Sequence, residues 1–169
     1  MKFRILFSII FLALASLTVA DELRSAVDSK DRSEKNVARD EFRKPYETLS
    51  FFQLEPDMTI VELSPGGGWY TEILANYIRK SGNLIAAHFS KDSDRAYFRN
   101  SRIKFEKKVK ENDLYEKVTV VDLNSELSDP SSVDAVLTFR NLHNWLGPNM
   151  DKIFSNSFNV LKPGGLFGI

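Results

Sequence analysis

The stretch that decides the fold is MTIVELSPGGGWYTEILANYIRKSG, residues 58–82. Met58 to Leu63 is a short apolar run bounded by turn residues, which is typical of a buried strand. Three glycines follow, and from Trp69 to Lys80 the apolar residues recur at helical spacing. A strand, a glycine-rich turn and a helix in this order predict a corner that binds an anion or a nucleotide. The glycines allow close approach of a ligand, and the N–H groups that begin the helix lie beside them.

The same alternation continues toward the C-terminus. Further apolar runs predict strands at 84–89, 118–121, 133–139 and 166–169. Periodic segments predict helices at 95–110 and 148–161, the second with Ile153, Phe154, Phe158 and Leu161 on one face. We therefore expect an α/β fold, a Rossmann-like and mostly parallel sheet with helices on both faces. Because the last run is a strand just starting, we expect a truncated chain in which the C-terminal strands of the fold are missing.

Upstream of the glycine turn, Val37 to Phe52 is amphipathic. Pro45 interrupts this segment, so a helix there is expected either to kink or to restart. Residues 21–36 are rich in charge and serine, and they are predicted to form a frayed lead-in. The expected organisation is this charged lead-in, followed over 37–169 by one domain that is incomplete at its C-terminal end.

The first twenty residues resemble a targeting signal. Lys2 and Arg4 precede an apolar run from Ile5 to Leu17, and the small residues Thr18 and Ala20 then stand before Asp21. This pattern predicts a secretory signal peptide that is cleaved after Ala20. The alternative is an uncleaved membrane anchor, but the run is shorter than the roughly 20 residues that a spanning helix needs. We expect a secreted or periplasmic protein with no stable membrane span after cleavage.

Composition narrows the function classes. The 169 residues include 23 basic and 23 acidic side chains and no cysteine. Balanced charge does not indicate a nucleic-acid partner, and without cysteine there is no disulfide, thiolate metal site or cysteine nucleophile. The two histidines, His88 and His143, are far apart in the sequence, so no metal site is predicted. The basic run 102–110 is interpreted as a solvated helix face.

The spacing of residues around the glycines indicates which class of cofactor the loop would bind. A dinucleotide fingerprint requires a third glycine where Thr71 stands, which disfavours a nicotinamide-dependent oxidoreductase. A phosphate-binding P-loop requires a lysine after the glycines, and none follows. With Glu62 four residues before Gly66, the pattern E-x-S-x-G-x-G resembles motif I of the class I S-adenosylmethionine-dependent methyltransferases. Ser64 stands in place of the first glycine of that motif.

Other segments support this resemblance. VDAVLTF (133–139) is similar to the fourth-strand motif of these enzymes, and LKPGG (161–165) is similar to the turn before their fifth strand. More narrowly, PGGGWYTEIL (65–74), AAHF (86–89), AYFR (96–99) and LTFRNLHNW (137–145) resemble a family of predicted, exported bacterial methyltransferases. The resemblance covers residues 39–169. It implies methyl transfer from S-adenosylmethionine to a small-molecule or unknown acceptor.

The resemblance also implies a set of cofactor-binding residues, namely Glu62, Gly66, Gly67, Gly68, His88, Asp122 and Phe139. The glycines would lie under the methionine part of the cofactor, and Glu62 would orient their loop or bind the cofactor ammonium through water. His88 stands where an acidic residue normally binds both ribose hydroxyls, and an imidazole makes at most one good bond to a diol. Asp92 and Asp94 are candidates to replace it. Asp122 matches the position that contacts the adenine amino group, although it can equally cap a turn.

The loop after the fourth strand, FRNLHNW (139–145), lies beside the transferring methyl group in class I enzymes. The candidate catalytic residues here are His143, Arg140 and Asn141. His143 would accept a proton, and Arg140 would hold a carboxylate or phosphate of the substrate. The alternative is that the loop is structural, with asparagines that cap turns and Trp145 in the core.

A second function class stays open on the same fold. A non-catalytic protein could use the pocket to bind a nucleoside or a small metabolite. His88 in the ribose position and the incomplete sheet favour this alternative.

Overall fold

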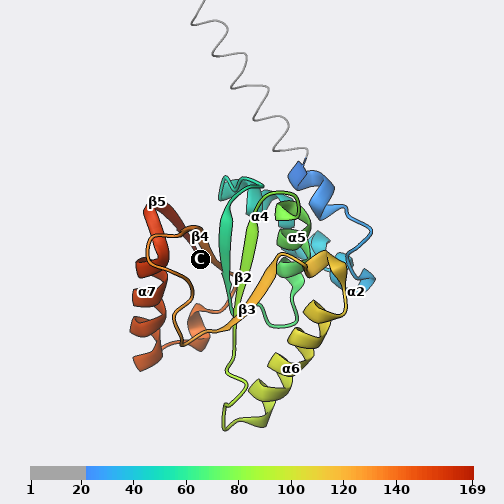
Figure 1. Ribbon diagram of the computed structural model, residues 1–169. Coiled ribbons are helices and arrows are strands. Elements are labelled where there is room, and N and C mark those ends of the chain that lie inside the picture. The colour runs from blue at the N-terminus through green and yellow to red at the C-terminus, as the bar shows by residue number, and fades with distance from the viewer. Residues whose placement is uncertain (1–21) are drawn as a thin grey trace, which may run out of the picture.

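The structure is a computed structural model that describes residues 22–169 (Figure 1). The predicted signal peptide, with its cleavage site after Ala20, lies outside the described residues. A five-stranded sheet has the order β3-β2-β1-β4-β5, and every neighbouring pair is parallel. The strands are β1 (Thr59–Leu63), β2 (Asn83–His88), β3 (Val118–Asp122), β4 (Val133–Thr138) and β5 (Leu161–Gly168). The predicted parallel α/β fold is confirmed.

Helices cover both faces of this sheet. They are α2 (Glu34–Val37), α3 (Asp40–Arg43), α4 (Pro45–Phe51), α5 (Trp69–Ile78), α6 (Ala96–Lys110) and α7 (Pro148–Val160), with 3₁₀ turns η1 (Asp113–Tyr115) and η2 (Leu142–Asn144). In Figure 1, α5 and α6 lie on one side of the sheet and α7 lies on the other. Within residues 22–169, no helix is both long enough and apolar enough to cross a membrane.

Side-chain alternation along the strands builds two separate cores. Ile60 of β1 packs with Ile73 of α5, whereas the next residue, Val61, belongs to the cluster that contains Ile153 of α7. Successive side chains of a strand point to opposite faces, so β1 serves both layers and is buried on each. This explains why Ile60 is apolar as well as Val61 and Leu63, although it faces the opposite side of the sheet from them.

The strand order sets the place of a binding site. The chain runs from β1 outward through β2 and β3, and it then returns to the other side of β1 for β4 and β5. In open α/β sheets, ligands bind at the carboxyl ends of the strands, where the order reverses. Here that point lies between the ends of β1 and β4.

The interpretation of residues 21–36 as a frayed lead-in is wrong for the described part of the segment. Residues 22–27 are helical, and Leu23, Ala26 and Val27 are buried in the core. Their i, i+3, i+4 spacing gives the short helix an apolar face that outweighs its charge content. The guanidinium of Arg32 is also buried, and it forms an ion pair with Asp40 at 2.6 Å.

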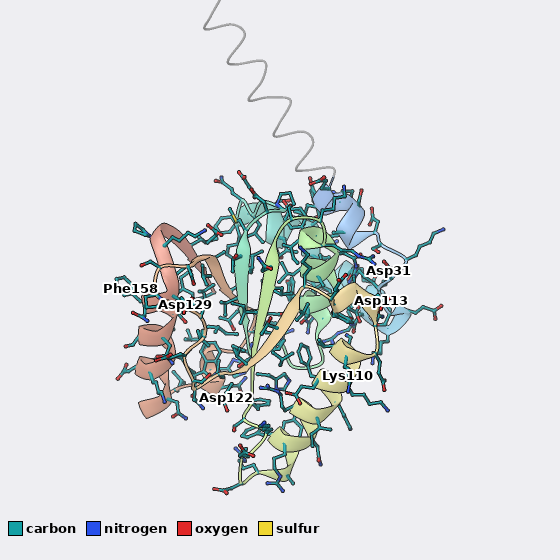
Figure 2. The ribbon with its side chains drawn as sticks, in the orientation of Figure 1. Asp31, Lys110, Asp113, Asp122, Asp129 and Phe158 are labelled. Atoms are coloured by element: carbon teal, nitrogen blue, oxygen red, sulfur yellow. The ribbon has the colours of Figure 1, made fainter. Side chains whose placement is uncertain are left out.

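Three local predictions can be compared with the structure. The helix restarts at Pro45, because Lys44 before it is left-handed with φ 47°. Phe158 does not share the buried face of α7: it is 83% exposed and lies on the outer side of that helix (Figure 2). The last strand begins at Leu161, earlier than the expected residue 166, and its pairing with β4 shifts register between Val133 and Ala135.

Candidate functional site

The glycine loop, residues 64–68, connects β1 to α5. Ser64, Gly66 and Gly68 are left-handed, with φ of 55°, 58° and 80°. Side chains with a Cβ rarely adopt this conformation, so the glycines are required by the turn itself. A Cβ added to Gly66 or Gly67 would meet no atom within 4 Å. The loop therefore presents its backbone to open space.

His88 supports the loop from the end of β2. Its side chain is fully buried, and the Phe89 N–H donates to Nδ1 at 2.7 Å. Nε2 therefore carries the proton and donates to the carbonyl of Gly66 at 3.1 Å. Burial lowers the pKa of His88, so the ring stays neutral. Both ring nitrogens thus have partners within the chain, and the predicted contact of His88 with a ribose stays a prediction.

Lys108 of α6 holds the other side of the loop. Its Nζ donates to the carbonyls of Gly67 and Gly68 at 3.2 and 3.4 Å, and it forms an ion pair with Glu72 at 2.8 Å. Glu72 also accepts hydrogen bonds from the backbone N–H and the hydroxyl of Ser33. One carboxylate therefore joins the N-terminal segment, α5 and α6 beside the glycine loop.

The interpretation of 102–110 as a solvated helix face is wrong for Arg102 as well as for Lys108. The buried guanidinium of Arg102 donates to the carbonyls of Phe89 and Val121 at 3.1 and 2.7 Å, which fastens the end of β2 to the end of β3. Helical spacing could have predicted that Arg102 is buried, because it stands three residues before the buried Phe105 and so lies on the same inward side of α6.

Glu62 lies near the end of β1 and is 2% exposed. Its Oε2 accepts a hydrogen bond from the Thr71 hydroxyl at 2.6 Å. Burial raises the pKa of Glu62 to about 7, against the opposing effects of Thr71 and Lys108. The carboxyl group is therefore poised to gain or lose a proton near neutral pH.

A main cavity of about 870 Å³ opens at the carboxyl edge of the sheet. Its lining includes Ser64, Gly66, Gly67, Asp92, Asp94, Leu123, Asn124, Asn141 and Trp145. They come from the glycine loop and from the segments that follow β2, β3 and β4. Asp122 itself ends β3 (Figure 2), where its Oδ1 accepts from the Asn124 N–H at 2.8 Å and so caps a turn.

A narrow cavity adjoins the main cavity, and an outer cavity adjoins the narrow one. The narrow cavity, of about 50 Å³, shares Ser64 and Asn141 with the main cavity. The outer cavity, of about 440 Å³, shares Arg43, Tyr70 and Phe139 with the narrow cavity. The shared walls place the narrow cavity between the other two. Glu62 also lines it.

The residues predicted to act together in the loop after β4 do not line the same cavity. Asn141 lines the main and narrow cavities, and its Nδ2 donates to the Ser64 carbonyl at 3.2 Å. Arg140 lines the outer cavity with a left-handed φ of 61°. Phe139 stacks on Tyr70 with 3.5 Å between ring centroids. His143 is exposed in η2 and lines none of the three cavities.

A family comparison identifies the class of protein that carries this arrangement. A family model described as methyltransferase domain matches residues 61–169. The match covers more than half of the chain, so the chain belongs to the methyltransferase domain family. S-adenosylmethionine is the cofactor that this membership indicates. A search of curated protein sequences finds no match.

Solved structures share the fold. A SAM-dependent methyltransferase from Aquifex aeolicus superposes with a TM-score of 0.61 at 21% identity, over 82% of this chain and 67% of that chain. A SAM-dependent O-methyltransferase from Thermotoga maritima gives 0.52 at 20% identity, over 74% and 42%. A cyclase gives 0.55 at 19% identity, over 73% and 42%. Likeness at such identities shows the fold alone, and one fold hosts several chemistries. This chain spans 67% of the first structure and 42% of the other two.

The main cavity fits this cofactor. The bare backbone at Gly66 and Gly67 leaves room for a ligand to lie against the loop. The Ser64 hydroxyl is buried without a hydrogen-bond partner in the described residues, at a position that lines both the main and narrow cavities. Asp92 and Asp94, in the segment after β2, place carboxylates on the cavity wall, and a carboxylate can accept hydrogen bonds from hydroxyl groups. The Ser64 hydroxyl and the carboxylates of Asp92 and Asp94 are polar groups of the kind that a nucleoside requires in its binding site.

Lys108→Met removes the cation that holds the glycine loop while it keeps most of the side-chain length. We expect affinity for S-adenosylhomocysteine, measured by calorimetric titration, to fall about tenfold, because two loop carbonyls lose a charged donor. Lys107→Met is the matched control, since Lys107 is exposed and only approaches Glu111 at 3.9 Å. Equal affinities in the two variants would contradict the role given to Lys108.

Glu62→Gln tests the raised pKa of Glu62. The fold favours the protonated carboxyl, so its contribution to stability is complete below about pH 4.5 and is lost as the pH rises through about 7. From about pH 5 to about pH 8, the free energy of unfolding should fall by ~2 kcal/mol more in the natural chain than in the variant. Urea unfolding at the two pH values measures this difference. Parallel pH dependence would show that Glu62 ionises normally.

Proposed function

We propose that this chain catalyses methyl transfer from S-adenosylmethionine to an acceptor bound in the outer cavity. The observation that carries the proposal is the succession of three adjoining cavities. The main cavity meets the glycine loop, the outer cavity is walled by other elements, and the narrow cavity between them has room for one small group. A group that moves from one ligand to another requires two sites that lie this close together.

The residues of the chain then have distinct tasks. S-adenosylmethionine, when bound, supplies a methyl group on a positively charged sulfur. The loop backbone at Gly66 and Gly67 and the carboxylates of Asp92 and Asp94 hold the cofactor. Asn141 fixes the mouth of the narrow cavity through its bond to the Ser64 carbonyl. Catalysis rests mainly on positioning, because a correctly oriented pair of reactants needs little further assistance.

Glu62 can accept a proton from the acceptor. It lines the narrow cavity, and the raised pKa of about 7 suits a general base near neutral pH. His143 was the base suggested by the sequence. Its exposed position in η2, away from the three cavities, favours Glu62 for this task.

We further propose that the chain is one of the exported bacterial methyltransferases that its segments at 65–74 and 137–145 resemble. The support is the basic, apolar and small-residue pattern of residues 1–20 together with those segments. The protein would then act outside the cytosol, with no nucleic acid as partner.

Gly67→Leu tests the cofactor site. Gly67 is not left-handed and its Cβ would meet no atom, so the new side chain should enter the main cavity without strain in the fold. We expect affinity for S-adenosylhomocysteine to fall at least about tenfold in calorimetric titration, with thermal unfolding unchanged. Unaltered affinity would contradict the proposed site. Tighter binding of NAD than of S-adenosylhomocysteine would indicate an oxidoreductase, and binding without methyl transfer to any acceptor would favour the non-catalytic alternative.

Expression of the chain in a bacterium tests export. We expect the protein recovered from the periplasm or the medium to begin at Asp21, as read by N-terminal sequencing. A variant with Arg in place of Ala20 should remain uncleaved, because the small residue before the cut is required. Natural protein found only in the cytosol with Met1 intact would contradict the proposal.

A further inference from the structure

We propose that the acceptor is a small aromatic carboxylate, held in the outer cavity by Arg43 and Arg140 on its anionic end and by aromatic side chains on its flat body. This inference rests on the proposed function only in treating the bound molecule as the methyl acceptor. The binding site itself is argued from the outer cavity alone.

The first observation is a pair of cations without counterions. Arg43 ends α3 and Arg140 follows β4, and both line the outer cavity. Within residues 22–169, neither guanidinium forms an ion pair with a carboxylate. By contrast, the buried Arg32 and Arg102 pair with Asp40 and Glu106. The fold has therefore brought two like charges to one cavity without neutralising them.

The positive charge of Arg140 also acts on Arg43. Burial lowers the pKa of Arg43, and the charges of Arg39 and Arg140 lower it further. A carboxylate placed in the cavity would replace this repulsion with attraction. Arginine is suited to the task because its planar guanidinium can bind a carboxylate through two parallel hydrogen bonds.

The second observation is the aromatic wall of the same cavity. Its aromatic lining residues are Phe42, Phe52, Tyr70 and Phe139. Phe139 lies at the centre of the group, stacked on Tyr70 and edge-to-face with Phe52 at 6.2 Å. Phe42 is 80% exposed, a large apolar surface left open at the cavity. Flat apolar walls favour a ring over an inorganic anion, because a ring buries aromatic surface that phosphate would leave in water.

The third observation is that the outer cavity shares a wall with the narrow cavity. Arg43, Tyr70 and Phe139 line the narrow cavity as well. A ring held against Phe139 can therefore direct a hydroxyl or amino substituent into the narrow cavity, beside Glu62. A neutral aliphatic acceptor would leave both arginines without a partner.

Calorimetric titration with 4-hydroxybenzoate tests the proposal, using the 169-residue protein with and without S-adenosylhomocysteine. The comparison ligands are 4-hydroxybenzyl alcohol, which lacks the charge, and inorganic phosphate, which lacks the ring. We expect 4-hydroxybenzoate to bind at least about tenfold more tightly than either. Arg140→Gln and Arg43→Gln should each reduce its affinity about tenfold. Arg79→Gln, which removes an arginine paired with Asp31 on the surface, should leave it unchanged.

The outcomes separate this inference from the function on which it rests. Arg140 is exposed, so Arg140→Gln should fold normally and bind S-adenosylhomocysteine like the natural chain. Absence of 4-hydroxybenzoate binding, equal affinity for the neutral alcohol, equal affinity for phosphate, or indifference to both arginine variants would each overturn the carboxylate site. If 4-hydroxybenzoate binds as expected but S-adenosylhomocysteine does not, the site stands and the methyltransferase function fails.

Discussion

The hydrogen bond from His88 to the Gly66 carbonyl is the constraint on which the site depends. It links the end of β2 to the left-handed turn that leaves β1, so the loop is held by the sheet itself. Lys108 holds the next two carbonyls from α6. With these carbonyls engaged within the protein, the exposed side of the loop is left for a ligand. Ser64 begins this turn in a left-handed conformation, with φ 55°, which is strained for a residue with a Cβ. It stands where motif I, which this segment resembles, has its first glycine.

The sheet order gives this loop its functional setting. Because β4 returns to the side of β1 opposite β2, the segment after β4 meets the glycine loop across the carboxyl edge. Asn141 joins the two by its bond to Ser64. On one side of this contact lies the main cavity, and on the other lie the narrow and outer cavities. The proposed cofactor site and the proposed acceptor site therefore lie on the two sides of the narrow cavity, as transfer of a methyl group between them would require.

The sequence was sufficient for the fold, because apolar runs, glycines and helical spacing are local signals. Residues 58–82 predicted β1, the turn and α5 correctly, and Pro45 marked the restart of α4. It was insufficient where a role depends on a partner distant in the chain. The residues next to Lys108 in the sequence give no indication that its side chain binds the Gly67 carbonyl. Likewise, the charged composition of residues 22–36 gives no indication that Leu23 is buried in the core. In the site, the predicted residues Asn141 and Arg140 line cavities. The narrow cavity, which Arg43 and Glu62 both line, arises only from tertiary packing.

A crystal structure of the complex with S-adenosylhomocysteine tests the central claim most directly. We expect the homocysteine portion to lie on Gly66 and Gly67, with the sulfur facing the narrow cavity between Ser64 and Asn141. The hydrogen bond between His88 and Gly66 should be unchanged. A ligand found outside the main cavity, or one whose sulfur points away from the narrow cavity, would contradict this placement of the cofactor.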